Sequence, residues 1–369
     1  MSEHDEKRYV LRSESENTGL AYDFFDGIAK LVEQARVHVE RTVNRTICVT
    51  YYEVGRRIVE QEQDGAHRAA YGAKLLSELS SYLTERCGKG WSVGNLKNAR
   101  QFYTVYSPEI RKSVIGELEN RQSLYDFFKL SWTHYIVLMR IKDKHARHFY
   151  EVESVNQQWT VRQLKRQYDS SLFERLALSR DKDGAMRLAV EGQTIDRPRD
   201  ILKDPLVLEF LDLEQSLTYT ESDLESAIIA NLQKFLLEIG KGFLFEARQK
   251  RFAFDEKSFF VDLVFYNRLL QCYVLIDLKT GELKHQDLGQ MQMYVHYFDR
   301  HIKREFEKPT VGILLCQEKN DNIVELTLPN DSNIYASEYS LYLPDKALLQ
   351  RKLAEWVEEF EETHGGDNT

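Results

Sequence analysis

Two short apolar segments give the clearest pattern in the chain. Residues 258–266, SFFVDLVFY, and residues 271–278, QCYVLIDL, are almost continuously apolar and rich in β-branched and aromatic side chains. Runs of this length are too short for separate helices and are typical of strands buried on both faces of a sheet. We therefore predict two central strands, joined by a short turn near Asn267 and Arg268.

The surrounding sequence predicts further elements of the same domain. The segment FLFEARQKRFAF is too dense in polar and basic residues for a buried strand, so it predicts an edge strand or a bent strand. Strands are also expected over residues 310–316 and 323–328. Apolar residues that recur at intervals of three and four predict helices over residues 222–239, 286–300 and 345–360.

The N-terminal half shows helical periodicity instead. Helices are expected over residues 20–63 and 71–86 and within residues 140–180. After residue 180 the periodicity is lost, and the chain gains charge and proline, which is typical of a boundary between domains. The predicted organisation is a helical domain over residues 19–180, a linker over 181–204 and a second domain over 205–362.

A glycine turn, Gly88-Lys89-Gly90, follows the second of these helices, and Ser92 can cap a third one. Helix, turn and capped helix outline a helix-turn-helix, in which Lys97 and Arg100 would contact DNA. The alternative is an ordinary solvated helix face. Basic residues within 140–180, Arg147 and Arg166 among them, either extend such a basic surface or only solvate two helices.

Composition limits the classes of function. The 369 residues are 42% hydrophobic and 30% charged, as in ordinary globular proteins. A net charge of −9 argues against a protein that coats nucleic acid by bulk attraction, so any contact with DNA requires a local basic face. No apolar run is long enough for a membrane span, and the polar N-terminus lacks the core of a signal peptide. We expect a cytoplasmic protein with no membrane partner.

Charged residues interrupt the two predicted central strands. Asp262 lies inside the first strand, and Asp277 and Lys279 lie at the end of the second. Burial of a lone carboxylate costs roughly several kcal/mol unless the group is paired, protonated or bound to a cation. Two carboxylates and an ammonium at one strand end would suit a hard divalent cation such as Mg²⁺ and an anionic substrate. The alternative is a buried structural ion pair.

These residues resemble a known motif. Val261-Asp262 and Asp277-Leu278-Lys279 look like the D…(D/E)xK motif of the PD-(D/E)xK phosphodiesterases, a superfamily that includes restriction enzymes and Holliday-junction resolvases. Val261 replaces the proline of the superfamily name, and Asp277 stands where many members have glutamate. Neither difference removes a ligand oxygen. Gln290 and Tyr294 resemble the QxxxY element of some exonuclease-like branches.

A closer resemblance covers residues 22–356. The phrases DPLVLEFLDL, FLLEIGKGFLFEARQKRF and VDLVFYNRLLQCYVLIDLKTG look like the YhcG family of bacterial proteins. The resemblance implies an all-α N-terminal domain and an α/β, restriction-endonuclease-like C-terminal domain, with a mixed central sheet flanked by helices. Three strands would be antiparallel neighbours, and a later strand would return beside them through a helical crossover.

The same resemblance implies a metal-dependent DNA endonuclease or exonuclease. Asp262, Asp277, the Leu278 main-chain carbonyl and Glu225 would bind Mg²⁺ or Mn²⁺, and Lys279 would orient the attacking water or hold the phosphate. Glu225 has an alternative role, because it has capping-box spacing from Ser222. The residues expected to contact the substrate are Gln290, Tyr294, Arg248, Gln249, Lys97 and Arg100.

Two further expectations concern partners. Superfamily members that cut two strands act as dimers, so a homodimer is expected by analogy. In an alternative function, the protein binds DNA or recruits a partner, with weak hydrolysis or none.

Overall fold

The computed structural model describes residues 3–64, 69–113, 121–180, 182–203, 205–213, 219–254, 257–329 and 331–364. The chain forms two compact units, Met1–Arg140 and Ile141–Thr369. Among the described helices, none is both long and apolar enough to cross a membrane.

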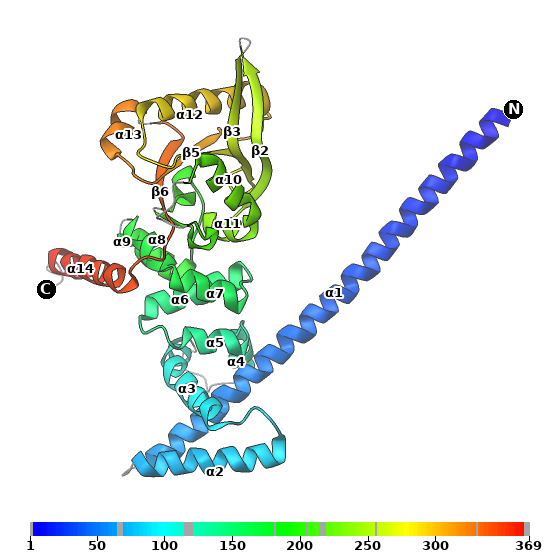
Figure 1. Cartoon of the computed structure of the whole chain (residues 1–369). Helices are drawn as coiled ribbons and strands as arrows, with labels where there is room; N and C mark the ends of the chain where they lie inside the picture. Colours follow the sequence, from blue (N-terminus) through cyan, green and yellow to red (C-terminus); the bar gives the residue numbers. More distant parts are fainter. Residues whose placement is uncertain are drawn as a thin grey trace. The chain divides into compact units, whose positions relative to one another are not determined.

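The first unit is helical (Figure 1). Its elements are α1 (Glu3–Asp64), α2 (Ala69–Cys87), α3 (Val93–Ser113), α4 (Arg121–Phe127) and α5 (Trp132–Leu138). The expected helices over 20–63 and 71–86 are therefore confirmed. The Ser92 hydroxyl accepts a hydrogen bond of 3.3 Å from the Asn95 N–H, which is the predicted cap.

Aromatic side chains form the core of this unit. The fully buried Phe102 ring contacts Tyr106, Phe128 and Tyr135 with centroid distances of 5.1, 4.8 and 5.2 Å. Edge-on and tilted contacts of this kind add to the free energy gained by burying the rings. The core therefore holds α3, α4 and α5 together, and Tyr52 joins α1 to it through Phe102.

Gly55 sets the distance between α1 and α3. A Cβ atom at this position would lie 2.0 Å from the Ala99 carbonyl oxygen and 3.1 Å from the Tyr103 Cβ. Such a contact with the backbone cannot be relieved by a side-chain rotation. The two helices can pack at this distance only because residue 55 has no side chain.

The second unit contains a six-stranded mixed sheet (Figure 1). The strands lie in the order β1 (Leu206–Val207), β6 (Ile334–Ser340), β5 (Val311–Cys316), β4 (Cys272–Leu278), β3 (Lys257–Asn267) and β2 (Phe243–Phe254). Strands β2, β3 and β4 are antiparallel neighbours, and β5 lies parallel to β4. This arrangement confirms the predicted mixed sheet and the return of a strand through a helical crossover.

Helices cover both faces of the sheet. Apolar residues of α10 (Glu221–Ala230) and α11 (Leu232–Ile239) pack against Leu263, Phe265 and Ile276 on one face. On the other face, Leu288 and Met291 of α12 (His285–Tyr297) pack against alternate residues of the same strands. The two central strands are thus buried on both sides, as their apolar sequence predicts.

Two predicted elements differ from the structure. Residues 323–328 were expected to form a strand, but all except Leu328 belong to helix α13 (Asp321–Thr327). The Asn320 side chain accepts a 3.3 Å hydrogen bond from the Ile323 N–H at the start of this helix. The strand that follows β5 in the sheet is β6, whose sequence, IYASEYS, is largely polar and half-buried. A predicted single helix over 222–239 is broken at Asn231, which separates α10 from α11.

A layer of helices precedes the sheet and belongs to the same unit. These helices are α6 (Lys144–Asn156), α7 (Val161–Asp169), α8 (Leu172–Leu178) and α9 (Lys182–Glu191), with 3₁₀ turns at Pro198–Ile201 and Glu209–Leu211. The unit also includes a π-helical turn, Phe298–Ile302, and the C-terminal helix α14 (Lys346–His364). Residues of the expected linker therefore form α9 and a 3₁₀ turn, and the division between the two units falls after Arg140.

Buried charges join the helical layer to the sheet. Glu238 on α11 is fully buried, and its two carboxylate oxygens accept hydrogen bonds of 2.8 Å from Arg175 and Arg166. Burial raises the pKa of Glu238, but the charges of Arg175, Lys203 and Arg166 outweigh this effect and lower it to about 2. Arg166 is therefore part of neither a basic surface nor a solvated helix face, because its charge is used inside the unit.

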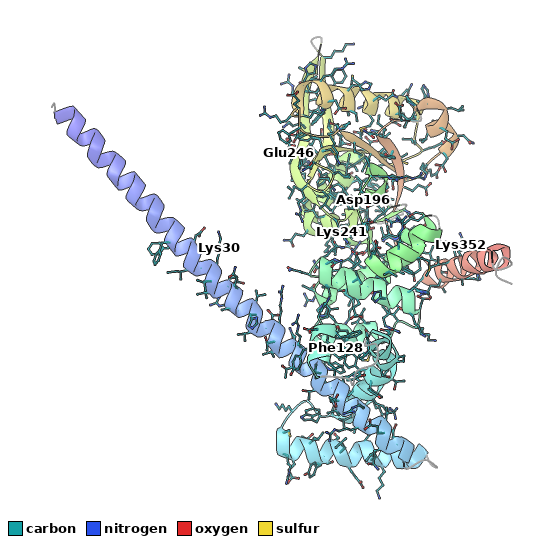
Figure 2. The ribbon with its side chains drawn as sticks, turned by 180° about the vertical axis from the view of Figure 1, so that it is seen from behind. Lys30, Phe128, Asp196, Lys241, Glu246 and Lys352 are labelled. Carbon is teal, nitrogen blue, oxygen red and sulfur yellow. The ribbon has the colours of Figure 1, made fainter. Side chains whose placement is uncertain are left out.

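A second ion pair connects the same layers. The Lys241 ammonium, labelled in Figure 2, lies 2.7 Å from a carboxylate oxygen of Glu153, and the Gln193 N–H donates to that oxygen at 2.7 Å. Glu153 lies on α6, and Lys241 lies two residues before β2, so this contact fixes the helical layer to the beginning of that strand.

We predict that Gly55→Ala will destabilise the protein by about 3 kcal/mol or more, because the new methyl group overlaps the Ala99 carbonyl. Gly27→Ala is a matched control on the same helix, since a Cβ there has no described atom within 4 Å. The control should change stability by less than about 1 kcal/mol. Urea unfolding of both variants measures the difference, and equal stabilities would contradict the assigned close packing of α1 and α3.

Removing the buried negative charge tests the second unit. Glu238→Gln leaves Arg166, Arg175 and Lys203 without their counter-charge and should cost about 3 to 5 kcal/mol. Glu355→Gln, in an ion pair exposed on both sides, should change stability by less than about 0.5 kcal/mol. Thermal unfolding of the two variants compares them, and similar midpoints would show that the buried network contributes little.

Candidate active site

The predicted site residues on the central strands lie at one end of the sheet. Leu263 of β3 pairs with Ile276 of β4, so Asp262 and Asp277 occupy the next position of the antiparallel pair. Lys279 follows the last residue of β4, and its N–H donates a 2.7 Å hydrogen bond to the Leu315 carbonyl of β5. The sequence alone did not determine how the two strands pair. The observed pairing brings Asp262, Asp277 and Lys279 together.

Each acid has a defined partner. The Leu278 N–H donates a 2.8 Å hydrogen bond to Oδ2 of Asp262. The Lys279 ammonium lies 2.8 Å from Oδ2 of Asp277 and 3.6 Å from Oε2 of Glu221. Oδ2 of Asp277 is buried, and the Lys279 ammonium is its charged neighbour.

The electrostatics follow from this geometry. Burial, followed by the nearby charge of Asp262, raises the pKa of Asp277 to about 7, and the attraction to Lys279 only partly offsets both effects. Burial alone would lower the pKa of Lys279, but its pairing with Asp277 outweighs burial and raises that pKa. Near neutral pH, Asp277 therefore exchanges a proton readily, while Lys279 keeps its charge.

Glu225 lies at the same end of the sheet but does not close the helix cap. The capping box of α10 is formed by Thr220 and Asp223, so the capping role considered for Ser222 and Glu225 is wrong. The Glu225 side chain is buried, and it accepts hydrogen bonds from the Arg248 guanidinium and the Gln249 amide.

Gln249 joins two of the acids. Its side-chain amide donates to Glu225 and also donates a 2.9 Å hydrogen bond to Oδ1 of Asp262. The residue has a backbone φ of 48°, which is uncommon for a non-glycine residue. Gln249 lies in β2, a few residues after the irregularity in the pairing of β2 with β3 between Phe245 and Ala247. Arg248 and Gln249, predicted to contact substrate, are therefore bound to acids of the site.

The QxxxY pair lies on helix α12. The Gln290 amide donates a hydrogen bond to the Tyr294 hydroxyl. Tyr294 is buried, and burial raises its pKa, with smaller contributions from Asp277 and Asp262 in the same direction. The Tyr294 phenol is thus within electrostatic reach of the two acids, whereas Gln290 is exposed.

The two predicted DNA contacts in the first unit differ in environment. Lys97 is exposed, whereas the Arg100 guanidinium lies 2.8 Å from a carboxylate oxygen of Glu62. The Asn95 amide donates to the Gly90 carbonyl at 2.8 Å, so it stabilises the glycine turn. Much of the polar face of α3 is therefore used within the helical unit.

The oxygen atoms at the sheet end suit a hard divalent cation. Asp262, Asp277 and the Leu278 carbonyl are the oxygen donors present, and two facing carboxylates favour a cation between them. Among the described residues, no group of three or more His, Cys, Asp and Glu is arranged to hold a metal ion. In this arrangement Glu225 is bound to Arg248 and Gln249.

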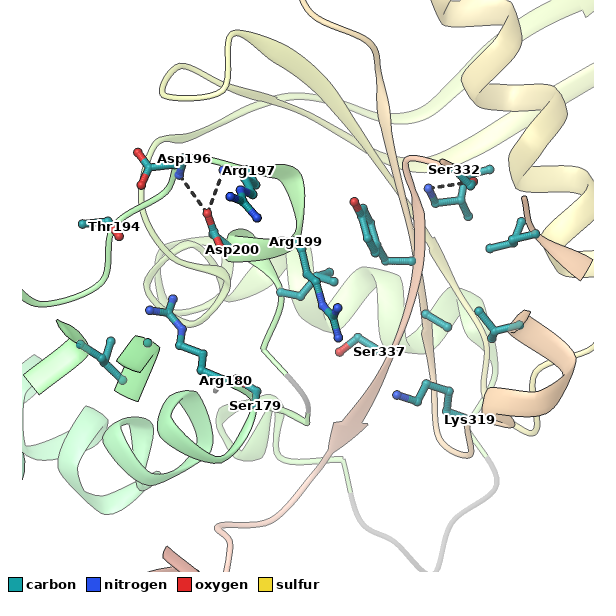
Figure 3. Close-up of a pocket in the computed structure, with 18 of the residues that line it drawn as sticks. Ser179, Arg180, Thr194, Asp196, Arg197, Arg199, Asp200, Lys319, Ser332 and Ser337 are labelled. Carbon is teal, nitrogen blue, oxygen red and sulfur yellow. Dashed lines mark hydrogen bonds between the residues drawn. The ribbon is translucent and has the colours of Figure 1, made fainter. Parts of the chain in front are cut away.

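A pocket of about 1080 Å³ lies elsewhere in the second unit. Arg180, Arg199 and Lys319 are among its lining residues, and their side chains surround the hollow in Figure 3. Acidic residues such as Asp196 and Asp200 line it as well, so its charge is mixed. None of the predicted catalytic, metal or substrate residues lines this pocket, and it is not the candidate active site.

Sequence reasoning missed two contacts of the site. Glu221 lies 3.6 Å from Lys279, and the Leu278 N–H orients Asp262, although only the Leu278 carbonyl had been predicted to act. The signal for Glu221 was weak, because an acid in the first turn of a helix is ordinarily explained by the helix dipole.

Together, the mixed sheet, its covering helices and the paired acids define a nuclease domain of the PDDEXK class. The sequence model of the YhcG PDDEXK nuclease domain matches residues 199–354, and that of the DUF1016 N-terminal domain matches residues 27–175. The chain is 39% identical to a protein of Escherichia coli (strain K12) named "Putative nuclease YhcG", over 93% of this chain and 96% of that protein. The chain belongs to the YhcG family.

Solved structures show weaker likenesses. The match to a structure titled "Structure of EndoMS-dsDNA2 complex" covers 36% of this chain and 48% of the matched chain, with 20% sequence identity and a TM-score of 0.26. The match to a repair endonuclease from Pyrococcus abyssi covers 35% of this chain and 50% of the matched chain, with 21% sequence identity and a TM-score of 0.23. Scores this low support no inference about this chain.

The two family matches leave residues 176–198 between them, whereas the structure divides into two units after Arg140. The predicted linker over residues 181–204 therefore stays a prediction.

We predict that divalent cations bind more tightly as pH rises. For a pKa of about 7, the fraction of ionised Asp277 increases about tenfold between pH 6 and pH 8. The proton and the cation compete for the same oxygens. Calorimetric titration of the metal-free protein with Mn²⁺ should therefore show about tenfold tighter binding at pH 8. In Asp277→Asn the pH dependence should disappear. Equal affinity at both pH values in the unaltered protein would exclude Asp277 as a ligand.

Proposed function

We propose that this chain is a divalent-metal-dependent nuclease that hydrolyses phosphodiester bonds in DNA. The observation that supports the proposal most directly is the convergence of Asp262, Asp277 and Lys279 at the end of two buried strands. Membership of the YhcG family and the match to a PDDEXK nuclease domain support the reaction class.

The proposed ligands are Asp262, Asp277 and the Leu278 carbonyl, with Glu225 joining when Arg248 and Gln249 release it. When bound, Mg²⁺ or Mn²⁺ would lower the pKa of a water molecule and stabilise negative charge on the phosphate oxygens. Gln249 holds Asp262 in position, since its amide donates to Oδ1 while the Leu278 N–H donates to Oδ2. The two hydrogen bonds fix the carboxylate plane before any substrate arrives.

Lys279 acts on the anionic substrate in this proposal. Its ammonium stays protonated because Asp277 raises its pKa, so it can hold a phosphate oxygen or orient the attacking water. Tyr294 and Gln290 form a hydrogen-bonded pair at the side of α12 and would contact the substrate next to the acids. Arg248 would exchange Glu225 for a DNA phosphate once a cation compensates the carboxylate charge.

The N-terminal unit would contribute recognition of DNA or of a partner. The exposed Lys97 is its best candidate for a phosphate contact, whereas Arg100 would first have to leave Glu62. Gly88 and Gly90 both adopt positive φ in the turn between α2 and α3, which supports the proposal of a helix-turn-helix there.

A second function is favoured by one observation. Because Glu225 is bound to Arg248 and Gln249, hydrolysis can be conditional or absent, and the protein would then act by binding DNA or recruiting a partner. The choice between the two functions depends on whether cleavage accompanies DNA binding.

We predict that Lys279→Ala and Asp277→Asn will each lower DNA cleavage by about a hundredfold or more. The first removes the positive charge that faces the phosphate, and the second removes a negative ligand of the proposed cation. Lys284→Ala is the control: Glu282 and Lys284 share the same acid-x-lysine spacing but are exposed, so cleavage should be unchanged. The assay uses linear, circular and branched DNA with Mg²⁺ or Mn²⁺.

DNA binding is measured on the same samples by gel shift. Cleavage by Lys279→Ala at the rate of the unaltered protein would refute the site. Binding without cleavage of any of these DNAs would favour the accessory function.

A further inference from the structure

The hairpin of β2 and β3 extends beyond the rest of the sheet (Figure 1). The pairing of β4 with β3 spans Leu263–Asn267, whereas β2 pairs with β3 as far as Lys257. Asp262 of the candidate active site therefore lies where the hairpin leaves the sheet. An extension in this place is positioned to contact a molecule that binds at the site.

Helix α12 covers one face of the hairpin. Phe252 and Phe259 stack with a centroid distance of 5.5 Å, and Phe252 stacks on Tyr297 of α12 at 4.1 Å. Neighbouring residues in a strand point to opposite faces of the sheet. Arg251 and Phe260, the next cross-strand pair, therefore lie on the face away from α12.

The face away from α12 presents an aromatic ring beside a guanidinium. Phe260 is 45% exposed, so its ring is accessible to a ligand. The Arg251 guanidinium donates hydrogen bonds of 3.1 and 3.0 Å to the Ser258 hydroxyl. Because this hydroxyl is neutral, the charge of Arg251 remains available to an anion. An aromatic ring next to a cation is the combination that binds a base and its phosphate in single-stranded nucleic acid.

The surrounding charge favours an anionic ligand. Residues 248–254 contain three basic side chains and no acidic one, in a chain whose net charge is −9. Arg248 pairs with Glu225, and Lys250 pairs with Glu246. Beyond this stretch the sequence continues with Asp255, Glu256 and Lys257. A chain with this net charge needs a local basic surface to bind a polyanion, and β2 provides one next to the site.

The position of the ring indicates which part of a DNA substrate it would meet. Phe260 is two residues from Asp262 in β3, which places their Cα atoms about 7 Å apart. The ring would thus meet a nucleotide close to the phosphate that is cleaved. Bases in a duplex stack on one another, whereas the face of an unpaired base is open to an aromatic side chain.

We propose that Phe260 and Arg251 bind an unpaired nucleotide of the DNA substrate beside the scissile phosphate. The base stacks on the Phe260 ring, and the Arg251 guanidinium holds a phosphate of the same strand. The inference rests on the proposed nuclease function and adds the class of substrate. That class is DNA with a single-stranded segment, such as a single strand, an overhang or a branch.

The test separates contacts to bases from contacts to phosphates. Fluorescence anisotropy measures binding of the full-length protein to labelled oligothymidylate and to an abasic deoxyribose-phosphate oligomer of equal length, in EDTA so that no cleavage occurs. Phe260→Ala should bind oligothymidylate about tenfold more weakly and the abasic oligomer unchanged. Phe260→Trp should retain the affinity, and Arg251→Ala should weaken binding of both oligomers.

Phe306→Ala is the matched control. Phe306 is 78% exposed in the same unit but lies outside the hairpin, so its removal should leave both affinities unchanged. Thermal unfolding checks that every variant is folded. Because Phe260 and Phe306 are both exposed, neither truncation should lower the unfolding midpoint substantially.

Three binding results would overturn the inference. One is an unaltered protein that does not bind oligothymidylate. Another is an equal loss on both oligomers in Phe260→Ala, which would show that the ring supports the strand and does not contact a base. The third is an equal loss on blunt duplex and on oligothymidylate, which would indicate that the ring inserts into a duplex.

Cleavage assays distinguish failure of this inference from failure of the proposed function. If Lys279→Ala abolishes cleavage while Phe260→Ala cuts blunt duplex and overhang DNA in unchanged proportion, the nuclease proposal stands and the nucleotide site is refuted. If no DNA is cleaved but Phe260→Ala loses affinity for oligothymidylate alone, the nucleotide site stands and the nuclease proposal is refuted.

Discussion

Two like charges held side by side are the constraint on which the candidate active site depends. Asp262 and Asp277 meet because the antiparallel register of β3 and β4 fixes them at adjacent positions, and the buried sheet leaves neither strand free to shift. The repulsion is moderated by Lys279, by the Leu278 N–H and by partial protonation of Asp277. Because a small divalent cation would relieve the repulsion between the two carboxylates, the site favours binding such a cation.

The buried network around Glu238 supports that arrangement. Arg166 and Arg175 come from the helical layer, whereas Glu238 lies on α11, which packs on the face of the sheet beside β3 and β4. Separating the two layers would leave three cations or an acid unpaired in the interior, at a cost of roughly several kcal/mol. The helices before the sheet are therefore structural parts of the unit that contains the paired acids.

The local sequence was sufficient to predict the central strands, the three residues at their end and the family. The apolar runs 258–266 and 271–278 specify strands β3 and β4 because burial on both faces leaves little alternative. The partner of each charged residue was not predictable. Arg166 looked like a surface residue, and Glu225 had the spacing of a cap, since the residues that bind them are far away in the sequence. Strand β6 was missed because its polar pattern follows from its position beside a short edge strand.

Glu225 connects the resting arrangement of the site to its proposed activity. Its carboxylate is buried, so it requires a positive neighbour in every state of the protein, and Arg248 now serves that purpose. A divalent cation bound by Asp262 and Asp277 would provide an alternative neighbour, and Gln249 already connects Glu225 to Asp262. Arg248, with its side chain 39% exposed, could then turn toward a phosphate without leaving a buried charge unpaired. Cation binding and release of Arg248 are therefore expected to occur together, because either change alone would leave a charge uncompensated.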